Sequence, residues 1–109
     1  MAERSFHRAA HQGQCEVCGK DTMVVVCSSS MGPFSFSYCE DCLRIGAEPY
    51  WFMVNVVAMN GLWPDSVCDA FQQKIRDTLK YLSRAEDDFK TDVHKAYHDI
   101  PVYANGQHK

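Results

Sequence analysis

The chain has 109 residues, of which 46% are hydrophobic and 23% charged. This is the size and composition of one small globular domain and not of a disordered chain. Its six cysteines are fewer than a disulfide scaffold of this length carries. The net charge of −3 gives the protein little general attraction for the phosphate backbone of nucleic acids.

From the sequence we expect no targeting or membrane-spanning segment. The longest nearly apolar stretch, Tyr50 to Met59, is too short to cross a bilayer. The first residues carry charges and histidines without an apolar run, unlike a secretory signal. We therefore expect a cytoplasmic protein without membrane contact. In that reducing environment paired cysteines bind metal more often than they form disulfides.

Four segments follow one another along the chain. Residues 1–14 are polar and are predicted to form a flexible N-terminal arm, whereas residues 15–47 carry two pairs of cysteines. Residues 48–100 are predicted to form a helical segment that packs on the cysteine-bearing module. The polar residues 101–109 follow Pro101 and are predicted to be a frayed tail.

A β-hairpin is predicted over Asp21 to Tyr38. Its first strand is rich in β-branched and apolar residues from Thr22 to Cys27, and the serine- and glycine-containing residues 28–33 supply the turn. In the returning strand, aromatic residues alternate with serines. That period of two is typical of a strand with one buried face.

Two helices are predicted after the hairpin. The first begins at Cys39–Glu40 and ends near Gly46; the second has Pro49 in its first turn and ends at Asn60-Gly61. The second is apolar on all sides, so its periodicity also fits a buried strand, but the flanking Pro and Gly favour a helix. An apolar helix of this kind is either enclosed or shared with another chain. We therefore expect a homodimer through this helix or an exposed apolar patch.

Two further helices complete the predicted bundle. The third begins at Asp65 or Ser66, and the fourth begins at the capping box Ser83-Arg84-Ala85-Glu86 and runs to about Tyr97. A single long helix bent at Ser83 is the alternative. The third and the fourth helix each have an apolar stripe at helical spacing. The simplest arrangement is a helical hairpin in which the two stripes face each other. The stripes are Cys68, Phe71, Ile75, Leu79 and Leu82, and then Ala85, Phe89, Val93 and Tyr97.

The strongest chemical signal is a pair of Cys-x-x-Cys motifs. Cys15 and Cys18 form the first, and Cys39 and Cys42 form the second after twenty intervening residues. This spacing is typical of zinc sites, in which four thiolates surround one ion as a tetrahedron. Gly19 follows the first pair and tolerates the left-handed backbone of a tight knuckle. One structural zinc ion per chain is therefore the expected cofactor.

Other uses of the cysteines remain open but are disfavoured. A rubredoxin-like iron site would have a second knuckle where this chain has a predicted helix. A redox-active disulfide would require one pair in a strand-to-helix junction of a βαβ unit. The remaining cysteines, Cys27 and Cys68, are expected to be buried as small hydrophobic residues. Two histidine pairs at helical spacing lack a third ligand, so no second metal site is expected; they are His7 with His11, and His94 with His98.

The succession of knuckle, hairpin and helix over about Gln14 to Ala47 resembles the treble-clef zinc finger. The resemblance implies that Cys15 and Cys18 are knuckle ligands and that Cys39 and Cys42 are helix ligands. The whole chain also resembles small, uncharacterised zinc proteins of bacteriophage and bacterial genomes. The predicted fold class is thus α+β: a zinc-bound treble clef over 15–47 followed by a small C-terminal helical bundle.

No catalytic residues are predicted. Four thiolates saturate a zinc ion, whereas a catalytic zinc keeps one position open. Treble-clef nucleases have a histidine at the end of the second strand, where this chain has Ser37-Tyr38-Cys39. There is neither a phosphate-binding glycine loop nor a nucleophile elbow in the sequence. We therefore expect a binding protein and not an enzyme.

Two kinds of partner are compatible with these residues. The first is a protein, which the module would bind, regulate or inhibit through clustered aromatic and Met residues beside the finger. The alternative is a nucleic acid bound through Lys20, Arg44, Arg4 and Arg8. Because acidic residues crowd the same surface and nucleic-acid binders present an excess of basic charge, protein binding is the favoured hypothesis.

Overall fold

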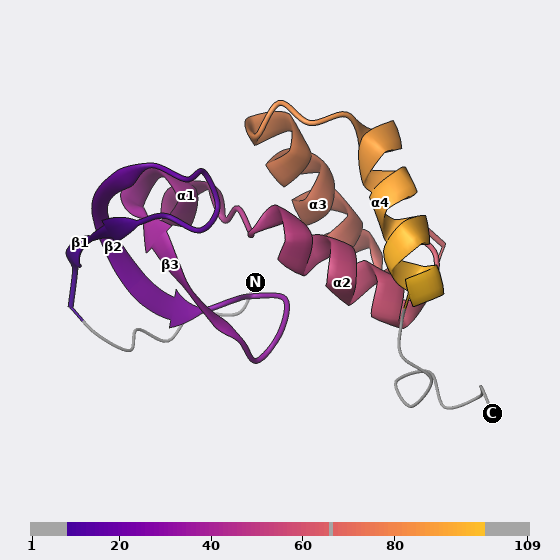
Figure 1. Ribbon diagram of the computed structural model, residues 1–109, viewed down its shortest axis with the longest axis horizontal. Helices are drawn as coiled ribbons and strands as arrows, with labels where there is room; N and C mark the ends of the chain where they lie inside the picture. The colour runs from indigo at the N-terminus through magenta and orange to yellow at the C-terminus, as the bar shows by residue number, and fades with distance from the viewer. Residues whose placement is uncertain (1–8, 66, 100–109) are drawn as a thin grey trace. The chain divides into compact units, whose positions relative to one another are not determined.

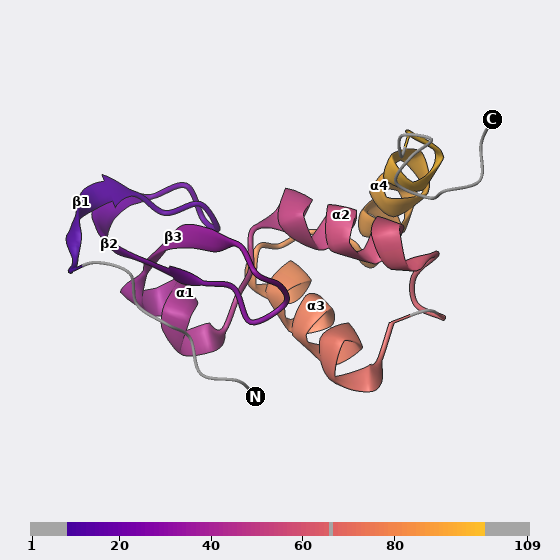
Figure 2. The same cartoon turned by 90° about the horizontal axis from the view of Figure 1, so that it is seen from below.

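A computed structural model describes residues 9–65 and 67–99 of the chain. The chain forms two compact units, Met1–Pro49 and Tyr50–Lys109. The first unit, indigo to magenta in Figure 1, contains an antiparallel sheet and one short helix. The second contains helices in its described part, as Figure 2 shows from another side. The predicted α+β class is confirmed.

The first unit is built on a sheet with strand order β1-β2-β3. Its strands are β1 (His11–Gln14), β2 (Asp21–Ser28) and β3 (Ser35–Cys39). β2 pairs antiparallel with both neighbours, and Val24 lies opposite His11 on one side and Cys39 on the other. Gln14 pairs with Asp21, so the first cysteine pair lies in the connection between β1 and β2. The predicted hairpin is confirmed as β2 and β3.

The strand β1 corrects the prediction of a flexible arm over residues 1–14. Its sequence, His-Gln-Gly-Gln, has no apolar alternation, and the strand is formed by backbone pairing with β2. Gly13 allows this close approach, because a Cβ there would lie 3.1 Å from Cγ2 of Val24. Residues 1–8 of the predicted arm lie outside the described residues.

The helix α1 (Glu40–Ile45) follows β3 without a linker. Cys39 is its N-cap residue, and Gly46 ends it in the left-handed conformation with φ of 80°. The Gly46 N–H donates to the carbonyl oxygens of Cys42 and Leu43, which is a typical glycine termination of a helix. The sequence predicts both ends of this helix correctly.

A buried carboxylate connects the hairpin turn to the segment after α1. Glu48 is 0% exposed. Its Oε1 accepts hydrogen bonds from the hydroxyl groups of Ser29, at 2.9 Å, and Tyr38, at 2.8 Å. Its Oε2 accepts hydrogen bonds from the Ser30 hydroxyl at 2.8 Å and the Ser30 N–H at 3.2 Å. A buried charge is tolerated when it is hydrogen-bonded in this way, so Glu48 is a structural residue of the first unit.

Aromatic contacts form the centre of the second unit. Its helices are α2 (Tyr50–Asn60), α3 (Asp69–Tyr81) and α4 (Glu86–Asp99). The ring of Phe89 packs edge-to-face on Tyr50, with centroids 5.8 Å apart, and on Trp63, with centroids 5.5 Å apart. α4 packs most closely on α2. The prediction that the stripes of α3 and α4 pair mainly with each other is therefore wrong.

The start of α3 also differs from the prediction. The helix begins at Asp69 and not at Asp65 or Ser66, and Cys68 is its N-cap residue. Cys68 is exposed, which corrects its predicted burial, whereas Cys27 is buried as predicted. Cys68 has the sequence spacing of the apolar stripe but does not share its buried face. As the N-cap residue it has extended backbone angles, so its side chain does not point in the direction that a helical residue would have.

Ser83 belongs to the end of α3 and not to the start of α4. It has φ of 59°, and its N–H donates to the carbonyl of Lys80 while the Arg84 N–H donates to that of Leu79. This pair of hydrogen bonds is a Schellman motif with serine in the position usually taken by glycine. The predicted capping box at Ser83 is therefore wrong, and α4 begins at Glu86.

The helix α2 is confirmed, and it is not fully enclosed. Trp51 and Met59 are 59% and 71% exposed, and with the exposed Asn55 they lie at steps of four residues along one face. We call these three residues the α2 stripe. The buried face comprises Tyr50, Met53, Val54, Val57 and Ala58. No helix in the described ranges is long and apolar enough to cross a membrane.

The Glu48 network gives a test of stability. Glu48→Ala leaves the hydroxyl groups of Ser29 and Tyr38 without this acceptor, so we expect the free energy of unfolding to fall by about 2–4 kcal/mol. Denaturant unfolding of the zinc-loaded protein measures the change. The matched control is Glu40→Ala at an exposed position, which should change stability by about 0.5 kcal/mol or less. Equal effects of the two substitutions would contradict the structural role of Glu48.

Candidate metal centre

The first cysteine pair lies in a tight turn between β1 and β2. The Gly19 N–H donates to the Cys15 carbonyl at 2.9 Å, and the Cys15 N–H donates to the Lys20 carbonyl at 2.9 Å. Gly19 has φ of 80°, a conformation that glycine adopts without strain. The turn therefore directs Cys15 and Cys18 to the same side, as the sequence predicts for a knuckle.

The second pair lies at the junction of β3 and α1. Cys39 is the last residue of β3 and the N-cap of α1, and Cys42 lies in the first turn of the helix. The first N–H groups of a helix have no partner within the helix and carry partial positive charge. Both ligands of the second pair are therefore positioned by the start of one helix.

The four sulfurs converge on one point. The Sγ atoms of Cys15, Cys18, Cys39 and Cys42 all lie within 4.8 Å of one another. The Cys15–Cys42 distance is 3.7 Å and the Cys18–Cys39 distance is 3.9 Å. A tetrahedron with zinc–sulfur bonds of about 2.3 Å has sulfurs roughly 3.8 Å apart. The cluster therefore has the size and donor chemistry of a single structural zinc site.

The thiols differ in their surroundings. Burial alone would raise the pKa of Cys15, but the N–H groups of Cys18, Cys39 and Val17 directed at its sulfur lower the pKa to about 7. Cys18 is the exposed member of the cluster, and partial burial together with the nearby Cys15 raises its pKa. Zinc binds thiolates, so the lowered pKa makes Cys15 easier to ionise for the metal than Cys18.

Glu16, between the first two ligands, joins the knuckle to β3. Its backbone N–H donates to the Ser37 carbonyl at 2.8 Å, and its Oε2 accepts a hydrogen bond from the Ser37 N–H at 2.7 Å. Glu16 thus occupies the outer edge of β3 as a neighbouring strand would. Sequence reasoning missed this role, because an acidic residue in a turn is ordinarily a solvent-facing residue.

The remaining candidate ligands do not join the site. Cys27 is buried in β2, and Cys68 lies in the other unit. Within residues 9–65 and 67–99, the four cysteines are the only group of three or more ligating side chains close enough to share an ion. His11, His94 and His98 are therefore not brought into such a group, and His7 lies outside the described residues.

Comparison with protein-family models, curated proteins and solved structures finds no match for the chain.

The metal centre predicts one zinc ion per chain. Cys15→Ser or Cys39→Ser should greatly lower zinc content, because each removes one of four thiolates from the coordination sphere. Elemental analysis of purified, reduced protein measures the metal. Cys27→Ala and Cys68→Ala are the matched controls and should retain one equivalent. Iron in the purified protein, or the absence of metal, would contradict the assignment.

The low pKa of Cys15 predicts a change in the pH dependence of zinc affinity. Above about pH 7 this thiol is already ionised, whereas below it one more proton must leave when zinc binds. The logarithm of the affinity should therefore fall more steeply with decreasing pH below about 7, by roughly one additional unit per pH unit. Competition with a chromophoric chelator measures the slope. An unchanged slope across pH 7 would show that Cys15 is not ionised before the other ligands.

Proposed function

We propose that the chain is a small protein-interaction module that is stabilised by structural zinc and has no catalytic activity of its own. Binding to a partner protein would regulate or inhibit that partner. The proposal includes the treble-clef assignment of the first unit, which the order of knuckle, hairpin and helix supports. The single observation that carries the interaction role is the exposed α2 stripe.

The stripe is unusual because two of its three residues, Trp51 and Met59, are large as well as apolar. Single exposed apolar residues are common on soluble proteins. Here Trp51 and Met59 lie on the same face of one helix, both more than half exposed. Trp and Met are enriched at the centres of protein interfaces. The helix carries no charged residue, so this face resembles an interface core more than an ordinary solvated surface.

The charges of the first unit favour a protein partner over a nucleic acid. Arg44, a candidate phosphate contact, pairs with Asp41 at 2.8 Å. A zinc ion bound to four thiolates adds a formal charge of −2 to the same unit. Phosphate binding requires an excess of basic charge, and the surroundings of Arg44 and Lys20 do not provide it.

Photo-crosslinking tests the interaction role. A benzophenone amino acid replaces Trp51 in the zinc-loaded protein expressed in its native host, and the same label at the exposed position Lys80 on α3 is the control. We expect a discrete protein adduct from position 51 that is absent from position 80 and is lost when Met59→Ser is added. A dimer of the chain would identify a second copy as the partner. Crosslinking to nucleic acid, or equal labelling from both positions, would contradict the proposal.

A further inference from the structure

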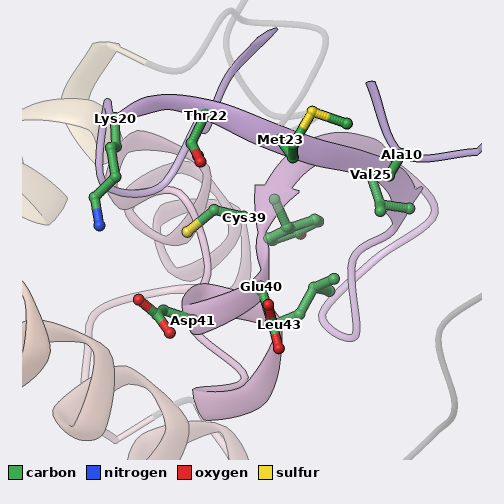
Figure 3. A pocket seen from close by; sticks show the side chains of 10 residues that line it. Ala10, Lys20, Thr22, Met23, Val25, Cys39, Glu40, Asp41 and Leu43 are labelled. Carbon is green, nitrogen blue, oxygen red and sulfur yellow. The ribbon is translucent and has the colours of Figure 1, made fainter. Parts of the chain in front are cut away.

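A pocket opens on the first unit beside the metal centre (Figure 3). It lies between β2 and the beginning of α1, and its volume is about 550 Å³. Pockets that bind small ligands or side chains typically enclose about 300–1,000 Å³. The neighbouring Cys39 forms part of its wall, so the metal centre holds one side of the pocket in place.

The pocket has an apolar end and a polar end. Met23 and Val25 of β2 and Leu43 of α1 gather at one end, and Lys20, Thr22 and Asp41 lie toward the other (Figure 3). Met23 is 52% exposed, so its flexible thioether is available for contact with a ligand. A ligand that fits this pocket has an apolar group joined to a polar or charged one.

The charges around the pocket determine whether the polar group of the ligand is a cation or an anion. Two carboxylates, those of Glu40 and Asp41, line the pocket against the single ammonium group of Lys20. The zinc–tetrathiolate centre behind Cys39 adds a charge of −2. Because Arg44 pairs with Asp41, the excess of negative charge comes from the zinc–tetrathiolate centre, and Glu40, which lies beside Leu43 (Figure 3), is the carboxylate left to pair with a ligand. The pocket therefore favours a cation and disfavours phosphates.

We propose that this pocket binds a segment of a partner protein in which a lysine or arginine lies next to an apolar side chain. The apolar side chain fills the end formed by Met23, Val25 and Leu43, and the cationic group lies against Glu40. The inference rests on the proposed function, because it names the chemistry of the partner. It uses a surface of the first unit and is independent of the α2 stripe.

The test is an NMR titration of the full, zinc-loaded chain labelled with nitrogen-15. The probe is a short synthetic peptide of alternating leucine and lysine, and its counterpart has glutamate in place of lysine. We expect the basic peptide to shift the amide signals of Val25, Glu40 and Leu43 and the acidic peptide to leave them unchanged. Equal shifts from both peptides, or shifts that avoid the pocket, would overturn the proposal.

Two single substitutions in the pocket test which side chains contact the peptide. Glu40→Gln keeps the shape of the side chain and should weaken binding of the basic peptide about fivefold through the loss of one exposed ion pair. Met23→Ser should weaken it by a similar factor, and Glu86→Gln, in the other unit, is the matched control and should leave it unchanged. Retained affinity in both pocket variants would overturn the proposal.

The two proposals fail separately. Peptide binding at the pocket without a crosslink from position 51 would refute the role of the α2 stripe and retain the pocket. A crosslink from position 51 without peptide binding would refute the pocket alone. Loss of both would refute the interaction module itself.

Discussion

Convergence of four thiolates on one metal ion is the constraint on which the first unit depends. The ligands come from the β1–β2 connection and from the β3–α1 junction, so a single ion joins the elements of this unit. Without the ion, no covalent or coordinate bond joins these four sulfurs, although they lie within 4.8 Å of one another. A structural zinc ion contributes apparent free energies of about 10–16 kcal/mol in finger peptides, which exceeds what a core of this size supplies.

Two glutamate side chains fix the loops of the first unit that the metal ligands do not hold directly. Glu16 holds the knuckle against the backbone of Ser37, and Glu48 holds the hairpin turn through Ser29, Ser30 and Tyr38. These hydrogen bonds specify geometry, because each carboxylate has partners only in one arrangement of the loops. The second unit is organised differently, around the apolar and aromatic contacts of Phe89.

The features that the sequence predicts correctly are those with local causes. Cysteine spacing identifies the ligands, Gly46 ends α1, and Pro49 and Gly61 bracket α2. The features it misses depend on distant partners. β1 is a strand because β2 lies beside it, and the apolar stripe of α4 shows which face is buried but not that α2 covers it.

Two further features that the sequence does not predict, the end of α3 at Ser83 and the burial of Glu48, have other physical causes. The pattern Ser83-x-x-Glu86 fits a capping box, yet the left-handed conformation of Ser83 ends α3 instead. Glu48 gives no signal of burial, since an isolated glutamate in a sequence is ordinarily exposed. Its role emerges only when the hydroxyl groups of the hairpin turn lie around it.

The most direct test of the metal's role is hydrogen exchange of the full chain with and without a zinc chelator. Because the thiolates organise the first unit and apolar packing organises the second, chelation should abolish amide protection in β2, β3 and α1. Protection in α2 and α4 should persist, since their contacts with each other do not involve the metal centre. Retained protection throughout the first unit, or simultaneous loss in both units, would contradict this account.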